Sequence, residues 1–141
     1  MKPAIQVRVQ AVIFGNDGAL LLASHERGGR TYWVLPGGKI EFGETMEEAL
    51  QRELREELGL ENTEVSGLVF LDEFIKPEDE RHVMQIAFAV NVPDDALSGV
   101  QVVAKGESIR AVSFFSEDAV RGSQDTFYPS KDLILGLFHL G

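Results

Sequence analysis

Three glutamates on one predicted helix have the residue type and spacing that best suit chemistry. Glu53, Glu56 and Glu57 lie three and four positions apart, so all three side chains project from one side of a helix. Clustered carboxylates repel one another and mildly destabilise the helix that carries them. Two interpretations follow. One is a solvated acidic face, which charge runs usually are. The other is a site for Mg²⁺ or Mn²⁺, which prefer oxygen ligands and bridge to substrate phosphates.

The helix that must position these glutamates is predicted over residues 45–58. Thr45 is a suitable N-cap, acidic residues occupy the first turn, and Gly59 follows the last residue, a pattern typical of helix limits. An apolar stripe recurs every four residues and consists of Leu50, Leu54 and Leu58. Because this stripe packs on the core, the glutamates beside it are expected to face a cleft at the flank of the helix.

The residues around the glutamates extend the pattern. Gly38 is followed after five residues by Glu44, and after seven more by the run RELREELGL at positions 52–60. This resembles the signature of the Nudix hydrolases, G-x5-E-x7-R-E-U-x-E-E-x-G-U, in which U is a bulky aliphatic residue. Every fixed position is matched, and the chance of this in so short a chain is below about one in a million. The resemblance therefore favours the metal site over the solvated acidic face.

The resemblance implies a role for each signature residue. The metal ligands it implies are the carbonyl of Gly38 and the carboxylates of Glu53, Glu56 and Glu57, with Mg²⁺ or Mn²⁺ as the cofactor. Glu44 is then a supporting acid at the junction of loop and helix. Arg52 orients the carboxylates through charge-assisted hydrogen bonds, although simple charge balance is an alternative for this arginine.

The activity that the resemblance implies is hydrolysis of the pyrophosphate in a nucleoside diphosphate linked to a group X. The metal stabilises charge on the leaving phosphate and activates a water molecule. Glu56 or Glu57 is the preferred general base, and Glu107, an acid just before the predicted strand 110–115, is the second choice. An ordinary loop carboxylate is the alternative for Glu107. The chain has no cysteine and no G-x-S-x-G elbow, so neither a thiolate nor a serine nucleophile is predicted.

Fewer residues indicate how the rest of the substrate is bound. Arg27 and Lys39 flank the signature and suit phosphate groups, with solvated surface charge as the alternative. Trp33 suits stacking on a base, with a core position as the alternative. The other aromatic candidates are Tyr32, Phe74, Phe127 and Tyr128. Nucleotide sugars, ADP-ribose, dinucleoside polyphosphates and nucleoside triphosphates all remain open as substrates.

A second class of function is a non-catalytic Nudix-fold module that binds a nucleotide as a sensor or regulator. Degenerate modules of this kind usually lose one of the glutamates, whereas this sequence retains all of them. A homodimer is left open by the sequence.

The elements around the signature predict one α/β domain over residues 1–141, with a mixed β-sheet between helices. The Nudix resemblance implies the same α/β/α sandwich. Strands are expected at 7–13, 19–24, 32–35, 65–74, 82–92 and 110–115. A polar loop is expected at 25–31 and a terminal amphipathic helix at 132–140.

The charge and the apolar content of the sequence limit which partners are expected. The 141 residues include 13 basic and 23 acidic side chains, giving a net charge of −10, which argues against non-specific binding of duplex nucleic acid. No stretch approaches the roughly 18 apolar residues of a membrane span. The first residues alternate between polar and apolar types rather than forming the apolar region of a signal peptide. The cytoplasm is therefore the expected location, and no membrane partner is expected.

Overall fold

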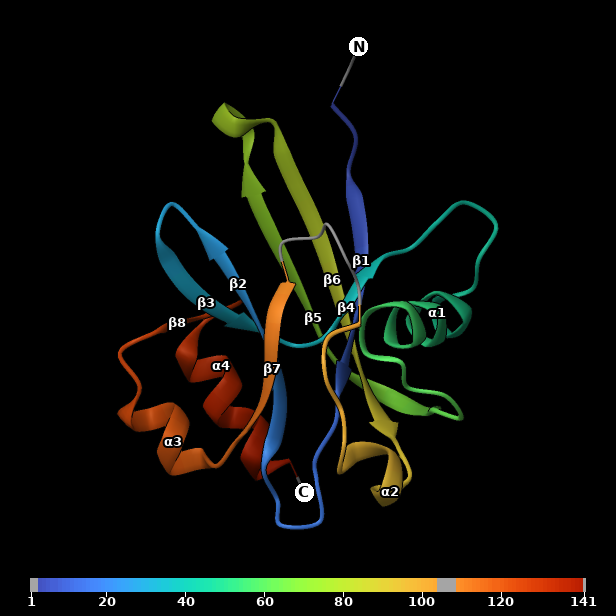
Figure 1. Cartoon of the computed structure of the whole chain (residues 1–141). Helices are drawn as coiled ribbons and strands as arrows, with labels where there is room; N and C mark the ends of the chain where they lie inside the picture. Colours follow the sequence, from blue (N-terminus) through green and yellow to red (C-terminus); the bar gives the residue numbers. More distant parts are fainter. Residues whose placement is uncertain (1–2, 104–108, 141) are drawn as a thin grey trace.

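The computed structural model describes residues 3–103 and 109–140, and its strands form two four-stranded sheets (Figure 1). The first sheet has the order β4-β1-β6-β5, with β4 Gly37–Lys39, β1 Gln6–Val12, β6 Arg81–Asn91 and β5 Glu64–Lys76. The second has the order β7-β2-β3-β8, with β7 Ile109–Phe115, β2 Leu20–Arg27, β3 Arg30–Val34 and β8 Thr126–Phe127. Both sheets are mixed, because β1 runs parallel to β6 and β3 runs parallel to β8.

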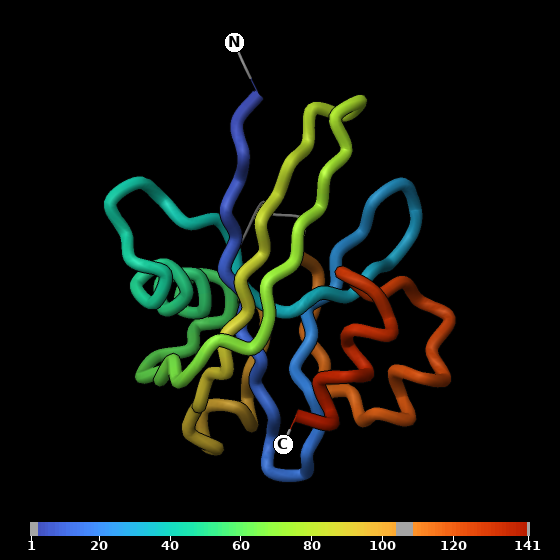
Figure 2. Tube along the Cα trace, turned by 180° about the vertical axis from the view of Figure 1, so that it is seen from behind, coloured from blue at the N-terminus to red at the C-terminus, as the bar shows by residue number. Residues whose placement is uncertain are grey.

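The helices lie on two sides of the strands. They are α1 Met46–Leu58, α2 Asp94–Leu97, α3 Glu117–Gly122 and α4 Lys131–Gly136, with 3₁₀ turns η1 Pro77–Asp79 and η2 Leu137–His139. Helix α1 lies beside β4 and β1, whereas α3 and α4 lie on the opposite side of the molecule (Figures 1 and 2). The predicted mixed α/β class is confirmed, with the strands divided between two sheets. No helix in the described ranges is long and apolar enough to cross a membrane.

Helix α1 begins and ends as its sequence predicts. The Thr45 side chain accepts a hydrogen bond from the Glu48 N–H at 3.1 Å, and the Glu48 carboxylate accepts one from the Thr45 N–H at 2.9 Å. This reciprocal pair satisfies two N–H groups that the first turn leaves without helical partners. Gly59 ends the helix with a φ of 67°, a left-handed conformation that glycine adopts without steric cost.

The polar loop expected at 25–31 is wrong. Strand β2 continues to Arg27 and β3 starts at Arg30, so only Gly28 and Gly29 form the turn. Both glycines have positive φ, 58° and 79°, as a two-residue hairpin turn with the twist of the strands requires. The polar residues of this segment therefore belong to a β-hairpin and not to a loop. The terminal helix is also shorter than expected and gives way to a 3₁₀ turn at Leu137–His139.

Alternation along β1 divides the core into two clusters. Val9, Ala11 and Ile13 pack with the leucines of α1, whereas Val12 faces the cluster that includes Leu20 and residues of α3 and α4. Successive residues of a strand point to opposite faces, so odd-numbered β1 residues mark the face of the first sheet that α1 covers. This face carries the candidate site.

Candidate functional site

The site is built where α1 lies against β4. Gly38 is buried and is paired with Val9 on the α1 face of the first sheet. A Cβ atom added at Gly38 would collide with all three atoms of the Glu53 carboxyl group. The glycine therefore allows the Glu53 carboxylate to lie directly on the backbone of β4, and this close approach joins the first signature residue to the helix.

Arg52 binds three of the signature acids, Glu44, Glu53 and Glu56. Its Nε donates to Glu44 Oε2 at 2.6 Å and its Nη2 to Glu44 Oε1 at 2.9 Å, a two-pronged contact that is characteristic of strong arginine–carboxylate pairs. Its Nη1 donates to Glu53 Oε1 at 2.9 Å and to Glu56 Oε2 at 3.2 Å. Nη2 also donates to the Lys39 carbonyl at 3.0 Å, which fixes the guanidinium against the end of β4.

These contacts shift the proton affinities of the pair. Hydrogen bonds from Arg52, followed by one from the Glu41 backbone, lower the pKa of Glu44 to about 2. The hydrogen bonds to Glu44 are also the main cause that raises the pKa of Arg52. Side-chain exposure is 16% for Arg52, 19% for Glu44 and 16% for Glu53, so their contacts are shielded from water. Glu56, at 58% exposed, extends toward solvent.

Glu57 lies at the inner edge of the acidic flank. Only 6% of the residue is exposed, in contrast to Glu56 beside it. Its carbonyl accepts a hydrogen bond from the Val103 N–H at 2.8 Å, so the segment that leads toward residue 104 runs past the end of α1. Glu107, the second candidate for the general base, lies outside the described residues.

The carboxylates of the signature are of a chemical type that binds metal ions. Within residues 3–103 and 109–140, no three His, Cys, Asp or Glu side chains are gathered in a geometry that would hold a metal ion. Glu44, Glu53 and Glu56 bind the nitrogens of Arg52 instead. Two observations nevertheless fit a hard divalent cation. The donors are carboxylate oxygens, and Gly38 keeps the β4 backbone bare where the Glu53 carboxylate rests.

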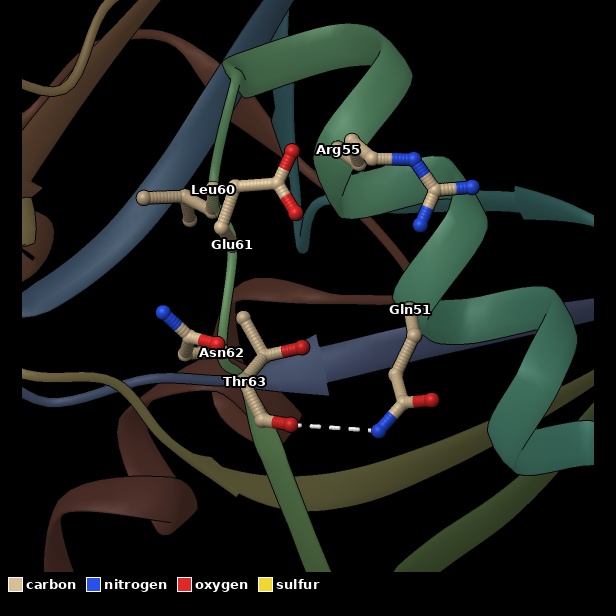
Figure 3. A pocket seen from close by; sticks show the side chains of 6 residues that line it. All are labelled: Gln51, Arg55, Leu60, Glu61, Asn62 and Thr63. Atoms are coloured by element: carbon tan, nitrogen blue, oxygen red, sulfur yellow. Dashed lines mark hydrogen bonds between the residues drawn. The ribbon is translucent and has the colours of Figure 1, made fainter.

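A separate hollow lies on the other flank of α1 and does not belong to this site. Gln51 and Arg55 from the helix line it together with residues 60–63 (Figure 3), and its volume is about 230 Å³. Gln51 Nε2 donates to the Thr63 carbonyl at 3.1 Å, which ties the helix to the segment before β5. On the helical wheel these side chains and the glutamates flank the leucine stripe on opposite sides.

The predicted substrate residues are dispersed. Arg27 lies at the tip of the β2–β3 hairpin, paired in register with Arg30. The Lys39 carbonyl belongs to the site, but strand alternation directs its exposed side chain to the face opposite Gly38. Trp33 packs against the cluster of α3 and α4, and its Nε1 donates to Asp125 Oδ2 at 2.9 Å. The structure thus brings Glu44, Glu53 and Glu56 together with Arg52, but the side chains of Arg27, Lys39 and Trp33 lie elsewhere.

Two contributors were missed from the sequence. Glu41 donates its backbone N–H to Glu44 Oε1 at 2.8 Å and places its own carboxylate 4.0 Å from Arg52. Glu41 precedes Glu44 by three residues, a spacing that is typical of a turn and could have indicated this contact. The contact of Val103 with the end of α1 had no such signal, because it depends on how distant segments pack.

Comparison with known proteins agrees with this geometry. A model of the NUDIX domain matches residues 4–135. The chain is 37% identical over 116 residues, 77% of its own length and 80% of the relative's, to the nucleoside triphosphatase NudI of Enterobacter sp. (strain 638). The solution structure of the E. coli ORF135 protein is 29% identical, with a TM-score of 0.68 over 99% of this chain and 90% of that one. The crystal structure of a MutT protein from Methanosarcina mazei Go1 is 25% identical, with a TM-score of 0.73 over 98% and 94%.

Proposed function

The chain belongs to the NUDIX family, and we propose that it is a Mg²⁺- or Mn²⁺-dependent pyrophosphohydrolase that cleaves the diphosphate of a nucleoside diphosphate linked to a group X. One observation carries the proposal: Arg52 holds Glu44, Glu53 and Glu56 by hydrogen bonds, and the Glu53 carboxylate lies against Gly38. The similarity to a protein named nucleoside triphosphatase supports nucleotides as the substrate class.

Glu53, Glu56 and Glu57 are the residues that would hold the metal, with the Gly38 carbonyl as a further ligand. A bound divalent cation would neutralise the diphosphate and activate water. Arg52 orients Glu53 and Glu56 through its hydrogen bonds.

The nucleophile is a water molecule, which these side chains can deprotonate. Its oxygen forms a bond to one phosphorus, the anhydride P–O bond breaks, and the bridging oxygen leaves on the other phosphate. Glu57 or Glu56 accepts the proton that the water loses, and Glu107 is the second choice for this base. The products are a nucleoside monophosphate and a phosphorylated X, and no covalent enzyme intermediate is needed.

The test is hydrolysis of a nucleotide panel with Mg²⁺, measured as phosphate released after phosphatase coupling. The panel contains nucleotide sugars, ADP-ribose, dinucleoside polyphosphates and nucleoside triphosphates. EDTA should abolish turnover, and Glu57→Gln should lower kcat by about 10²-fold or more, on the scale of general-base losses. Glu47→Gln is the matched control, because Glu47 is exposed in the first turn of the same helix. Metal-independent hydrolysis, or no hydrolysis of any member, contradicts the proposal.

A further inference from the structure

The face of the first sheet that carries the glutamates continues beyond α1. The pairing register places Gly38, Val9, Ile86 and Leu71 in one row across β4, β1, β6 and β5. The next row on the same face, toward the start of β1, contains Val7, Met84 and Glu73. Strands β5 and β6 project beyond α1 toward the N-terminal end of β1 (Figures 1 and 2). A ligand anchored at Gly38 and Glu53 can therefore extend along this face.

The extension is apolar and open. Val7, Met84 and Ile86 are half-buried, while Leu71 is 61% and Ile75 54% exposed. A hollow of about 300 Å³ on β5 and β6 is lined by Leu71, Glu73 and Met84 from this face. Asp72 and Gln85 also line it, and they are a cross-strand pair that alternation assigns to the opposite face. Exposed apolar surface beside a charged site is typical of a binding surface for the uncharged part of a ligand.

Glu73 interrupts this apolar surface with a carboxylate. Its cross-strand partner on the same face is Met84, whose other partner is Val7. Three strand spacings of about 4.8 Å separate β4 from β5, so Glu73 lies about 14 Å across the sheet from the strand of Gly38. An ionised carboxylate only accepts hydrogen bonds, and it repels phosphate. It can therefore face the sugar or base of a nucleotide whose diphosphate is at the glutamates of α1.

We propose that Glu73 is a specificity-determining residue that selects substrates with a neutral hydrogen-bond donor on the nucleoside. The donor is an exocyclic amino group of the base or a hydroxyl group of the sugar. The flat, apolar faces of the nucleoside pack on Met84, Leu71 and Ile75. This inference rests on the proposed function, since it locates the nucleoside relative to the hydrolytic site.

The test compares kcat/KM for substrate pairs that differ by one donor. ATP against purine-riboside triphosphate and GTP against ITP report the amino group, since each second member lacks only that group. CTP against dCTP and ATP against dATP report the sugar hydroxyl. The wild-type protein should prefer the donor-bearing member of at least one kind of pair. Glu73→Gln should reduce that preference by about tenfold or more, as expected for loss of a hydrogen bond to a charged acceptor.

Glu64→Gln is the matched control, because it removes the same charge from an exposed position at the far end of β5, and it should leave every ratio unchanged. Ratios that stay the same in Glu73→Gln, with wild-type activity present, overturn the role of Glu73 and leave the proposed function standing. Wild-type protein that hydrolyses no nucleotide with Mg²⁺ refutes the proposed function, and the inference fails with it.

Discussion

Replacing Arg52 with lysine should separate the positive charge of this residue from its geometry. The guanidinium makes five hydrogen bonds, to Glu44 twice, to Glu53, to Glu56 and to the Lys39 carbonyl. A lysine keeps the charge but has three donors on one nitrogen. At least two of the five contacts must be lost, and the planar fork that fits Glu44 cannot be reproduced.

The magnitude follows from which contacts are lost. A hydrogen bond to a charged group contributes about 1.5–3 kcal/mol, and Arg52, Glu44 and Glu53 are all less than one fifth exposed. The contact with Glu56 counts for less, because that side chain is 58% exposed. We expect Arg52→Lys to lower the free energy of unfolding by about 2–4 kcal/mol. Metal affinity or kcat should fall by about 10–100-fold, as when the groups that orient metal ligands are lost.

Urea denaturation and steady-state kinetics measure the two effects. Arg55→Lys is the matched control, since Arg55 lies on the same helix and makes no side-chain hydrogen bond or ion pair with the described residues. Its unfolding free energy should change by less than about 0.5 kcal/mol. If Arg52→Lys matches Arg55→Lys in both assays, the view that Arg52 organises the site is refuted.

Three further outcomes are expected. Gly38→Ala should lower kcat by about 10²-fold, because the added Cβ displaces the Glu53 carboxyl group. Gly67→Ala is the control and should leave kcat unchanged, because the space around its Cβ is open. Equal kcat values for the two variants would contradict the close approach of Glu53 to Gly38. The depressed pKa of Glu44 should stabilise the fold fully above about pH 4.5, and this contribution should disappear as pH falls toward 2. In urea titrations the stability difference between wild type and Glu44→Gln should therefore shrink over that range, and a constant difference would contradict the pKa shift. Trp33→Phe should lower stability by about 1 kcal/mol through loss of the bond to Asp125, and unchanged stability would show that this bond contributes nothing.

The fold was predictable where local chemistry determines it. The limits of α1 follow from Thr45 and Gly59, and its buried stripe follows from the leucine spacing. The β2–β3 hairpin was missed because its polar residues lie at a sheet end, where polarity reflects exposure and not loop structure. The division of the strands into two sheets depends on long-range pairing, such as the parallel register of β1 with β6, which no local pattern records.

The sequence predicted which residues form the site better than it predicted how they are arranged. Spacing along one helix placed Arg52 beside Glu53 and Glu56, and their hydrogen bonds agree with this. The approach of Gly38 to Glu53 joins residues from a strand and a helix, and only the packed structure shows that a glycine is required there. The row that contains Val7, Met84 and Glu73 could not be seen from sequence at all, since its members come from three strands whose register was unknown.

Hydrolysis in ¹⁸O-labelled water tests the central claim most directly. The substrate is a member of the panel that the protein cleaves, with ADP-ribose as the first trial, and products are identified by mass spectrometry and ³¹P NMR. Attack by water on the pyrophosphate predicts one ¹⁸O on a phosphorus of one product, and AMP with ribose 5-phosphate as the products of ADP-ribose. Release of free adenine or free ribose, or products without label on phosphorus, would contradict the account.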